Sequence, residues 1–600
     1  MAAPDFGRNL VDLFERSAAK GGEQPFLWGK VDGTYQPWSW TKVRDQIHRL
    51  SRAFRAKGLK PGDRVLLVSE NRPEWAITDL AILRAGGVTV PAYTTNTTDD
   101  HLHLLTDSGA SMVVVSGKKL SKALLPAITK AKSVKLLLTI DDMTLGTGAG
   151  LEAIGWGEAL ALGDESADFA EDPAATLAAD DLACLIYTSG TGGKPKGVML
   201  SHGNVTANVA SAYHVLEELG LGDDVFLSFL PLSHAYEHTA GQFLPIVIGA
   251  QIYYAEGIET LTTNLTEARP TIMACVPRLY EVMRQRILNG ISRQSGLKPK
   301  LFAKAVDIGS RAYEDPRSLS FVDRLLNPLL DRLVREKVRE RFGGRMKALV
   351  SGGAPLNYDV GLFFTALGLP LFQGYGQTEC SPVISVNRPG KVKLKTVGPP
   401  LPGIEVRFGD DGEILVRGDA VMKGYWQDQE STDRALIDGW LYTGDVGIID
   451  DEGFIQITDR KRDLIVNSGG DNVSPQRVEG IAALEPEIGQ VLVYGDKRPH
   501  LVALIVPDQE FVTAYAKVEG KSHDIAELAE DSDFQEVIGS AMKRVNNRLS
   551  PIERIRRFKI MSEPFSIENG MMTPTLKLKR QAIYREYDEM IGELYKGRVG

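Results

Sequence analysis

The sequence predicts an α/β protein of at least two domains. Its 600 residues exceed the length that one hydrophobic core usually serves. Segments rich in Val, Ile and Leu alternate with helical patterns through most of the first 450 residues, which indicates parallel sheets covered by helices. An apolar content of 43% and a charged content of 24% are typical of a globular chain.

The clearest elements of this alternation follow one another between residues 64 and 115. Residues 64–68 are predicted to form a buried strand, residues 74–85 a helix, and residues 111–115 the next strand. Residues 144–181 differ, because they are rich in Gly, Ala, Asp and Glu and hold few large apolar side chains. We expect this segment to be a surface excursion between two sheet units.

A further helix is predicted over residues 325–342. Pro328 would lie in its first turn, and Gly343 and Gly344 would end it. Its apolar residues recur at helical spacing and form one stripe: Leu326, Leu330, Leu333, Val334, Val338 and Phe342. Such a stripe is typical of a helix that packs on a core, and the alternative is a helix that lies on a membrane surface.

The best candidate for a domain boundary lies near Asp459. The segment 450–459 has the Gly turn of a hairpin, and the charged run 460–463 follows it. A charged run usually marks only a solvated surface, but this one also separates the first α/β region from a second one. The predicted domains are therefore residues 1–459 and 460–600.

Composition restricts the partners and the compartment. The net charge of −9 gives no reason to expect a nucleic-acid partner, and it weakens the case for strong attraction to anionic lipid. Cys184, Cys275 and Cys380 show neither metal-ligand nor disulfide spacing, which predicts buried thiols in a reducing cytoplasm. No apolar signal core is present, and the longest apolar run, residues 243–255, is too short to span a bilayer. The sequence predicts a cytoplasmic protein that contacts a membrane at most peripherally.

A loop of glycines, hydroxyls and lysines follows the apolar stretch 182–186. From residue 187 to residue 197 it has the sequence YTSGTGGKPKG. Glycines let backbone N–H groups turn toward an anion, hydroxyls add hydrogen-bond donors, and lysines neutralise phosphate charge. The Gly-Lys-Ser/Thr ending of a Walker A loop is missing. The loop therefore predicts a polyphosphate site of another kind.

This loop resembles the signature loop of the adenylate-forming superfamily, which includes acyl-CoA synthetases, luciferases and the adenylation domains of peptide synthetases. The family's usual loop has two consecutive threonines after the first glycine, and here a glycine replaces the second threonine. One side-chain donor is thereby lost, while the backbone N–H remains. The resemblance implies that the loop binds ATP through Thr188, Ser189, Gly190, Thr191, Gly192, Gly193, Lys194 and Lys196.

Two motifs in the middle of the chain continue the resemblance in the family's order. The segment 351–356, SGGAPL, resembles the loop that packs against adenine. The segment 373–379, QGYGQTE, resembles the family's central motif. The second motif implies that Tyr375 stacks on the base, that Thr378 bonds the α-phosphate, and that Glu379 holds Mg²⁺ together with Thr188. The two motifs supply further implied nucleotide contacts at Gly352, Gly353, Ala354, Pro355, Gln373, Gly374 and Gly376.

Three more motifs lie toward the C-terminus. YTGDVG has Asp445 at the position where the family bonds both ribose hydroxyls, which suits a two-oxygen acceptor. DRKRD supplies Arg460 for the nucleotide and Arg462 near the hinge. PTLKLKR matches the motif that bears the family's catalytic lysine, here Lys577, although Leu576 stands where the family has glycine.

The resemblance spans residues 187–580 and implies the family's fold. That fold has a large N-terminal domain of stacked α/β sheet subdomains and a small, mobile α+β C-terminal domain. The small domain rotates about a hinge, which we place at residues 459–462.

Within the superfamily, the chain resembles the long-chain fatty acyl-CoA synthetases in three segments. These are 230–238 (LPLSHAYEH), 276–287 (VPRLYEVMRQRI) and 463–475 (DLIVNSGGDNVSP). This resemblance implies that a fatty acid attacks ATP to give acyl-AMP and pyrophosphate, and that CoA then takes the acyl group and releases AMP. ATP, Mg²⁺ and CoA are the implied cofactors and co-substrates. His234 is implied to lie near the carboxylate and the α-phosphate, and a structurally bonded histidine is the alternative. Residues 243–254 either line an acyl tunnel or pack in the core.

Two other functions stay open at this stage. One is a fatty acyl-AMP ligase that passes the acyl group to a carrier protein. The other is a binding protein with an impaired site, which Gly192 and Leu576 motivate. The sequence also leaves open the preferred acyl chain length, the formation of a homodimer, which is common among relatives, and peripheral contact with a membrane.

Overall fold

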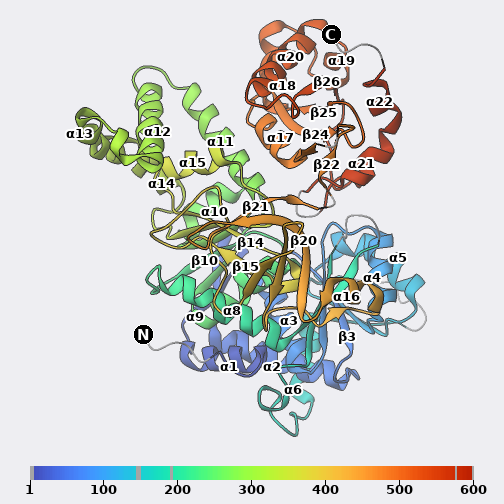
Figure 1. Ribbon diagram of the computed structural model, residues 1–600. Helices are drawn as coiled ribbons and strands as arrows, with labels where there is room; N and C mark the ends of the chain where they lie inside the picture. The colour runs from blue at the N-terminus through green and yellow to red at the C-terminus, as the bar shows by residue number, and fades with distance from the viewer. Residues whose placement is uncertain are drawn as a thin grey trace.

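The computed structural model describes residues 6–143, 151–188, 194–461, 463–469, 471–573 and 577–596. Within these residues the strands form two eight-stranded sheets, a five-stranded sheet, a three-stranded sheet and a two-stranded ribbon. Figure 1 shows the large sheets in the lower body, a group of helices that projects to one side, and the C-terminal part above. The predicted α/β fold class is confirmed.

One eight-stranded sheet has the strand order β15-β14-β13-β12-β10-β11-β1-β2. Its inner strands pair in parallel, and its two edges are antiparallel. The central strands β10 and β12 are buried along their whole length, as expected where helices cover both faces of a parallel sheet. The strands are β1 (Pro25–Val31), β2 (Thr34–Ser39), β10 (Val225–Ser228), β11 (Gln251–Tyr254), β12 (Ile272–Cys275), β13 (Ala348–Ser351), β14 (Leu371–Gly376) and β15 (Val383–Val386).

The other eight-stranded sheet has the order β18-β9-β8-β4-β3-β5-β6-β7. The strand predicted at residues 64–68 is β3, and the strand predicted at 111–115 is β5, so both predictions are confirmed. The predicted helix 74–85 is confirmed as α3 (Pro73–Arg84). The strands are β3 (Arg64–Val68), β4 (Val88–Ala92), β5 (Met112–Val115), β6 (Leu136–Thr139), β7 (Glu152–Gly155), β8 (Leu182–Thr188), β9 (Lys196–Ser201) and β18 (Gly424–Tyr425).

Helices cover these two sheets, and short polar side chains fix where several of them begin. The hydroxyl of Thr97 accepts a hydrogen bond from the third amide of α4, and Ser201 does the same for α8, each in a reciprocal capping box. The covering helices are α1 (Leu10–Gly21), α2 (Trp40–Ala56), α3, α4 (Thr98–Ser108), α5 (Lys118–Ala131), α6 (Trp156–Glu165), α7 (Pro173–Thr176), α8 (His202–Glu217), α9 (Leu244–Ile248), α10 (Leu261–Ala268) and α15 (Tyr358–Ala366).

The helical group that projects to one side connects β12 to β13. It consists of α11 (Pro277–Ser292), α12 (Lys298–Glu314), the 3₁₀ turn η2 (Pro316–Ser318), α13 (Phe321–Leu330), the π-helical turn η3 (Asp331–Arg335) and α14 (Glu336–Arg341). In Figure 1 α13 lies at the outer edge of this group, away from the sheets.

The helix predicted at 325–342 starts earlier than expected. Ser320 caps α13 and accepts a hydrogen bond from the amide of Asp323, so the helix begins at Phe321. Pro328 therefore lies inside the helix rather than in its first turn, and the π-helical turn η3 follows it. The predicted stop is confirmed, because Gly343 and Gly344 adopt positive φ angles of 90° and 76°.

The described part of the segment 144–181 does more than run over the surface. Strand β7 pairs in parallel with β6 and forms the edge of its sheet. Helix α6 packs on α2 and buries Ala159 and Leu160. The few apolar residues of this segment serve two short helices, since α7 also buries Ala174.

The apolar run 243–255 belongs mostly to the core. Phe243, Ile246 and Ile252 are fully buried within the main hydrophobic cluster. Cys184, Cys275 and Cys380 are buried free thiols, as predicted. None of the described helices has both the length and the apolarity that crossing a membrane requires.

A five-stranded sheet leads from the large body to the C-terminal part. The hairpin predicted at 450–459 is confirmed, because β20 and β21 pair antiparallel around a turn in which Gly453 has φ = 82°. The strands are β16 (Glu405–Phe408), β17 (Glu413–Arg417), β19 (Leu436–Ile437), β20 (Trp440–Ile449) and β21 (Ile455–Arg460), and α16 (Gln429–Ala435) lies between β18 and β19.

The C-terminal part has its own core. Two hydrophobic clusters hold together residues between 465 and 595, whereas Leu484 packs on a cluster of the large body. Its elements are β22 (Ile465–Val466), β23 (Asn472–Val473), α17 (Pro475–Ala482), β24 (Ile488–Tyr494), β25 (Leu501–Pro507), α18 (Gln509–Glu519), α19 (Ile525–Ala529), α20 (Ser532–Asn547), β26 (Ile555–Ile560), α21 (Arg580–Glu586) and α22 (Asp588–Glu593).

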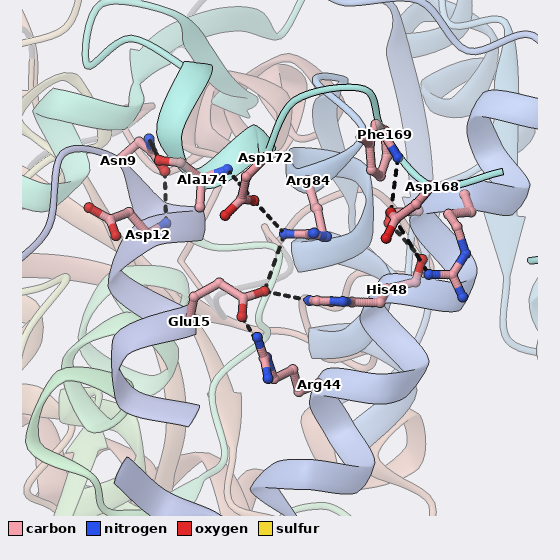
Figure 2. A network of polar contacts seen from close by, with 12 residues as sticks. Asn9, Asp12, Glu15, Arg44, His48, Arg84, Asp168, Phe169, Asp172 and Ala174 are labelled. Carbon is pink, nitrogen blue, oxygen red and sulfur yellow. Dashed lines mark hydrogen bonds and ion pairs between the residues drawn. The ribbon is translucent and has the colours of Figure 1, made fainter. Parts of the chain in front are cut away.

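A network of charged side chains joins the first three helices (Figure 2). Glu15 of α1 accepts hydrogen bonds from Arg44 at 2.6 Å and from Arg84 at 3.3 Å, and it lies 2.6 Å from Nε2 of His48. Arg84 also reaches Asp172 at 3.4 Å. Although burial alone would raise the pKa of Glu15, its cationic partners hold this pKa below the ordinary value. One carboxylate thus ties α1 to α2 and α3.

Candidate active site

Most of the predicted site residues that the structure describes line one cleft of about 2280 Å³. The cleft lies where the large body meets the C-terminal part, and both contribute to its walls. The predicted residues that line it are Thr188, Lys196, His234, Gly352, Gly353, Ala354, Pro355, Gln373, Gly374, Tyr375, Gly376, Thr378, Glu379, Asp445, Arg460 and Lys577.

Strand ends bring these residues together. Thr188 ends β8, and Tyr375 and Gly376 end β14, while the 351–356 loop follows β13 directly. In parallel sheets a ligand crevice forms at the carboxyl ends of the strands. Gly376 fits closely there, since a Cβ atom would lie 1.9 Å from the backbone oxygen of Pro382. This close approach explains a glycine at that position.

Asp445 lies at the floor of the cleft and is 3% exposed. The hydroxyl of Tyr375 donates to its Oδ2 at 2.7 Å, and Nε of Arg460 donates to its Oδ1 at 3.0 Å. Each carboxylate oxygen has a second lone pair, so both oxygens can still accept a ribose hydroxyl. Tyr375 and Arg460 therefore orient the carboxylate toward the nucleotide position that the resemblance implies.

Glu379 follows strand β14 and lies in the 3₁₀ turn η4 (Thr378–Cys380). The hydroxyl of Tyr425 donates to its Oε1 at 2.9 Å, and burial raises the pKa of this carboxyl. A bound cation would reverse that shift, because an opposite charge favours the ionised form. Sequence reasoning missed Tyr425, which has no motif spacing to Glu379 and meets it only through the pairing of β18 with β9.

The donor set fits Mg²⁺. Glu379 offers a carboxylate and Thr188 a hydroxyl, both hard oxygen donors on the wall of one cleft. Mg²⁺ commonly takes one or two protein ligands and completes its shell with phosphate and water oxygens. No group of three or more His, Cys, Asp or Glu side chains that would hold a metal alone occurs in the described parts of the chain. The arrangement therefore suits an ion that arrives with a polyphosphate.

Lys577 enters the cleft from the C-terminal part. Burial, and then the nearby charge of Arg460, lower the pKa of Lys577 to about 8. Burial, together with the charge of Lys577, also lowers the pKa of His234 to about 4, so this imidazole is neutral near pH 7. Both side chains are half-buried. The carboxylates of Asp445 and Asp463 favour the charged lysine but do not cancel the effects of desolvation and Arg460, so a bound anion would stabilise that charge further.

An ion pair holds the segment that bears Lys577. The guanidinium of Arg580 is paired with the carboxylate of Glu479 on α17, with one contact at 2.7 Å. Both side chains are only 12% exposed. The backbone amide of Lys577 also donates to the hydroxyl of Thr573 at 3.0 Å. These contacts fix the start of α21 and, with it, the direction from which the lysine enters.

The structure describes only part of the predicted phosphate loop. Residues 189–193 lie outside the described residues, and so does Arg462, so the predictions for Ser189, Gly190, Thr191, Gly192, Gly193 and Arg462 stay predictions. Lys194 is exposed and is not part of the cleft wall, whereas Lys196 lines it. Lys196 is bonded to Ser431 and lies 3.3 Å from Asp428, both near the start of α16.

Part of the cleft wall is apolar and comes from a place that the sequence did not indicate. Only Leu244 of the run 243–254 contributes to it. Helix α8, Leu219 just after it and the strands of the first sheet supply one continuous part of the rest, which comprises Ala212, Val215, Leu216, Leu219, Phe226, Ile272, Ala348, Val350 and Phe372. An apolar wall beside a polar nucleotide end suits a substrate with a hydrocarbon tail.

His238 serves the fold rather than the cleft. Its Nε2 lies 3.0 Å from Oδ2 of Asp79, which also accepts from Gln242 at 2.7 Å. His238 and Asp79 are buried, and neither lines the cleft. His234 and His238 are four residues apart in sequence, but His234 lines the cleft and His238 lies in the core.

Comparisons with known proteins agree with this site. A family model described as AMP-binding enzyme matches residues 14–426, and one described as AMP-binding enzyme C-terminal domain matches residues 462–599. The chain belongs to the AMP-binding enzyme family. A long-chain-fatty-acid–CoA ligase of Mycobacterium tuberculosis is 34% identical over 576 residues, which cover 94% of this chain and 93% of that protein. Long-chain-fatty-acid–CoA ligase 5 of Rattus norvegicus is 31% identical and covers 98% of this chain and 89% of its own.

Solved structures share the fold. The A domain of a carboxylic acid reductase from Segniliparus rugosus, in complex with AMP and a co-purified carboxylic acid, aligns with a TM-score of 0.77 at 21% identity. The alignment covers 98% of this chain and 94% of that one. The predicted family resemblance is thus confirmed, and so is the two-part fold of the AMP-binding enzymes.

Proposed function

We propose that the protein is an AMP-forming long-chain fatty acid–CoA ligase. The observation that carries the proposal is one cleft that joins the nucleotide-type residues Asp445 and Glu379 and the half-buried Lys577 to an apolar wall. Relatives named as long-chain-fatty-acid–CoA ligases match nearly the whole chain, which supports the same activity.

In the first step, a carboxylate oxygen of the fatty acid attacks the α-phosphorus of ATP. The bond to the pyrophosphate oxygen breaks, and pyrophosphate leaves with the electron pair. No general base is needed, because a carboxylate is already ionised near neutral pH. We assign to Lys577 and Thr378 the stabilisation of charge on the phosphate oxygens, and to neutral His234 the positioning of the carboxylate.

Mg²⁺, held by Glu379 and Thr188, would neutralise phosphate charge when bound. Adenine is assigned to the 351–356 loop and Tyr375, and ribose to Asp445. In the second step the sulfur of CoA attacks the acyl carbon, the bond to the AMP oxygen breaks, and the thiol proton passes to solvent. CoA as the acceptor is part of the proposal.

The boundary at residues 459 and 460 and the hinge at 459–462 are also proposed. The separate hydrophobic clusters of the C-terminal part support them. Among the described residues, polar contacts between the two parts include Asn357 to the backbone oxygen of Gly480 at 2.8 Å and Asn289 to Glu510 at 2.7 Å. Contacts of this kind are cheap to break, as a rotating domain requires.

The compartment and the assembly state complete the proposal. Three buried free thiols are consistent with the reducing cytoplasm that we propose. The formation of a homodimer stays a prediction. Sedimentation of the purified protein measures the oligomeric state. Peripheral contact with a membrane is proposed as well, and the next subsection assigns its surface.

One assay tests the ligase. The protein is incubated with palmitate, ATP and Mg²⁺, with and without CoA, and products are separated by chromatography and mass spectrometry. We expect palmitoyl-AMP and pyrophosphate without CoA, and palmitoyl-CoA and AMP with it. Adenylate that persists in the presence of CoA would instead support an acyl-AMP ligase, and absence of both products a binding protein.

A further inference from the structure

Helix α13 carries apolar side chains on two faces. One face packs inward, where Leu330 is 2% exposed and contacts Ala305 and Ile308 of α12. The other face points to solvent. A helix on the surface of a soluble protein normally keeps its apolar residues on the face that packs inward, so the exposed apolar face of α13 needs a separate explanation.

The exposed face is continuous. Phe321, Leu325, Leu329 and Leu333 follow one another at intervals of four residues and are 78%, 69%, 51% and 42% exposed. Val322 lies beside them and is 62% exposed. Residues four apart lie one above another on a helix, so these side chains form a single stripe. Leu333 stands in η3, which continues α13, and we call these five residues the α13 stripe.

Other exposed apolar residues of the described chain are arranged differently. Val518, which is 80% exposed, stands on α18, and Ile448 and Ile449 stand on β20. Single exposed apolar side chains are common on soluble proteins, whereas contiguous groups mark binding surfaces. The α13 stripe therefore differs in kind from these positions.

The helices around the stripe are strongly basic. Residues 277–342 contain 15 Lys and Arg against 8 Asp and Glu, although the whole chain has 69 against 78. The net negative charge of the whole chain argued against binding to anionic lipid, but the charged residues are unevenly distributed along the chain. The projection is positively charged, and the rest of the protein carries the negative excess.

Pairing within the group leaves cations beside the stripe. The carboxylate of Asp323 is bonded to Arg311 at 3.0 Å, and that of Asp331 to Arg339 at 2.8 Å. Arg324 and Arg332 are exposed, and no ion pair of either residue occurs within the described ranges. Arg324 lies on α13 and Arg332 in η3, and neither shares the buried face of Leu330. The two acidic side chains of α13 and η3 are therefore neutralised, while Arg324 and Arg332 border the apolar stripe.

We propose that the α13 stripe docks the protein on an anionic lipid bilayer. The apolar side chains enter the boundary between headgroups and acyl chains, and Arg324 and Arg332 contact lipid phosphates. The position of α13 at the outer edge of the projection (Figure 1) lets it meet a flat surface while the sheets stay clear of it. A second copy of the chain is the poorer occupant, since two positively charged projections repel each other.

Vesicle sedimentation tests this assignment. The purified full-length protein, without ATP, is mixed with vesicles of phosphatidylcholine alone or with phosphatidylglycerol added. We expect binding to the anionic vesicles that weakens as salt is raised. The double variant Leu325→Gln/Leu329→Gln should bind at least roughly tenfold more weakly. Arg324→Gln/Arg332→Gln should lose roughly fivefold for each arginine on anionic vesicles only.

Val518→Gln is the matched control, because it removes an apolar side chain elsewhere that is even more exposed than Leu325 and Leu329, and it should bind like the parent protein. Circular dichroism and acyl-CoA formation from a short, water-soluble fatty acid check that the variants fold, since none of these residues lies on the cleft wall. Absence of parent binding to anionic vesicles, or equal binding by the α13 double variant, would overturn the proposal. So would a parent dimer that this variant abolishes without any change in vesicle binding. Because binding is measured without ATP, failure of the ligase assay leaves this result unaffected.

Discussion

Lys577 gives the proposed adenylation step an upper pH limit. An ordinary lysine, with a pKa of 10.5, stays charged throughout the range in which enzymes are assayed, but burial and Arg460 lower the pKa of Lys577 to about 8. A lysine with that pKa is about nine-tenths charged at pH 7 and about one-tenth charged at pH 9. If only the charged form stabilises the phosphates, kcat/KM for ATP falls about tenfold between these pH values.

The assay must isolate the first step, because ionisation of the CoA thiol would raise the rate of the second. Pyrophosphate release is therefore followed without CoA, at saturating palmitate and low ATP. The profile of kcat/KM reports the free enzyme, whereas bound ATP adds negative charge and shifts the fall in kcat to higher pH. His234 does not interfere, because its pKa is lowered to about 4.

Two variants show whether the fall belongs to this lysine. Lys577→Ala should give a low rate without a decline between pH 7 and pH 9, and Lys577→Arg should keep its charge and also lack the decline. A flat parent profile over this range would refute the reasoning. The same decline in Lys577→Ala would refute it equally, since another group would then be titrating.

Three further predictions follow. Lys577→Ala should reduce pyrophosphate release by roughly a thousandfold while sparing palmitoyl-CoA formation from supplied palmitoyl-AMP, because the lysine serves one conformation only; equal losses in both half-reactions would contradict a rotating domain. Glu379→Gln should abolish Mg²⁺-dependent adenylation, and Tyr425→Phe, which removes only the hydroxyl that orients this carboxylate, should raise the Mg²⁺ concentration for half-maximal rate roughly tenfold; unchanged Mg²⁺ titrations would remove both residues from the metal site. Glu15→Gln should lower the free energy of unfolding by about 2 kcal/mol near pH 7 in urea titrations. Because the folded-state pKa of Glu15 lies below its ordinary 4.5, this difference should be present above that pH and disappear as the pH falls through the lowered pKa; a difference that persists in acid would exclude the ion pairs as its cause.

The sequence predicted those parts of the site that lie within short motifs. Asp445, Glu379 and Lys577 each stand at a fixed place in a run of a few residues, so their positions could be recognised without the fold. The strands β3 and β5 were predicted for a related reason, since fully buried parallel strands are continuous apolar runs.

Features that depend on distant pairings escaped prediction. Tyr425 reaches Glu379 across 46 residues, and nothing local in the sequence marks that contact. The apolar cleft wall comes from one face of α8 and from strand residues, which a sequence pattern cannot distinguish from ordinary core. Helix α13 was misplaced at its start because its exposed residues, Phe321 and Val322, are as apolar as its buried ones. Periodicity shows that a helix has apolar faces but not which face meets solvent.

The central claim is that the fatty acid carboxylate itself attacks the α-phosphorus of ATP. Palmitate labelled with ¹⁸O in both carboxylate oxygens tests this directly, with ATP, Mg²⁺ and CoA present and the products analysed by mass spectrometry. The account predicts one ¹⁸O atom in AMP and one retained in palmitoyl-CoA, because the bridging oxygen of the adenylate leaves with AMP. Unlabelled AMP, or label in inorganic phosphate alongside ADP, would contradict it.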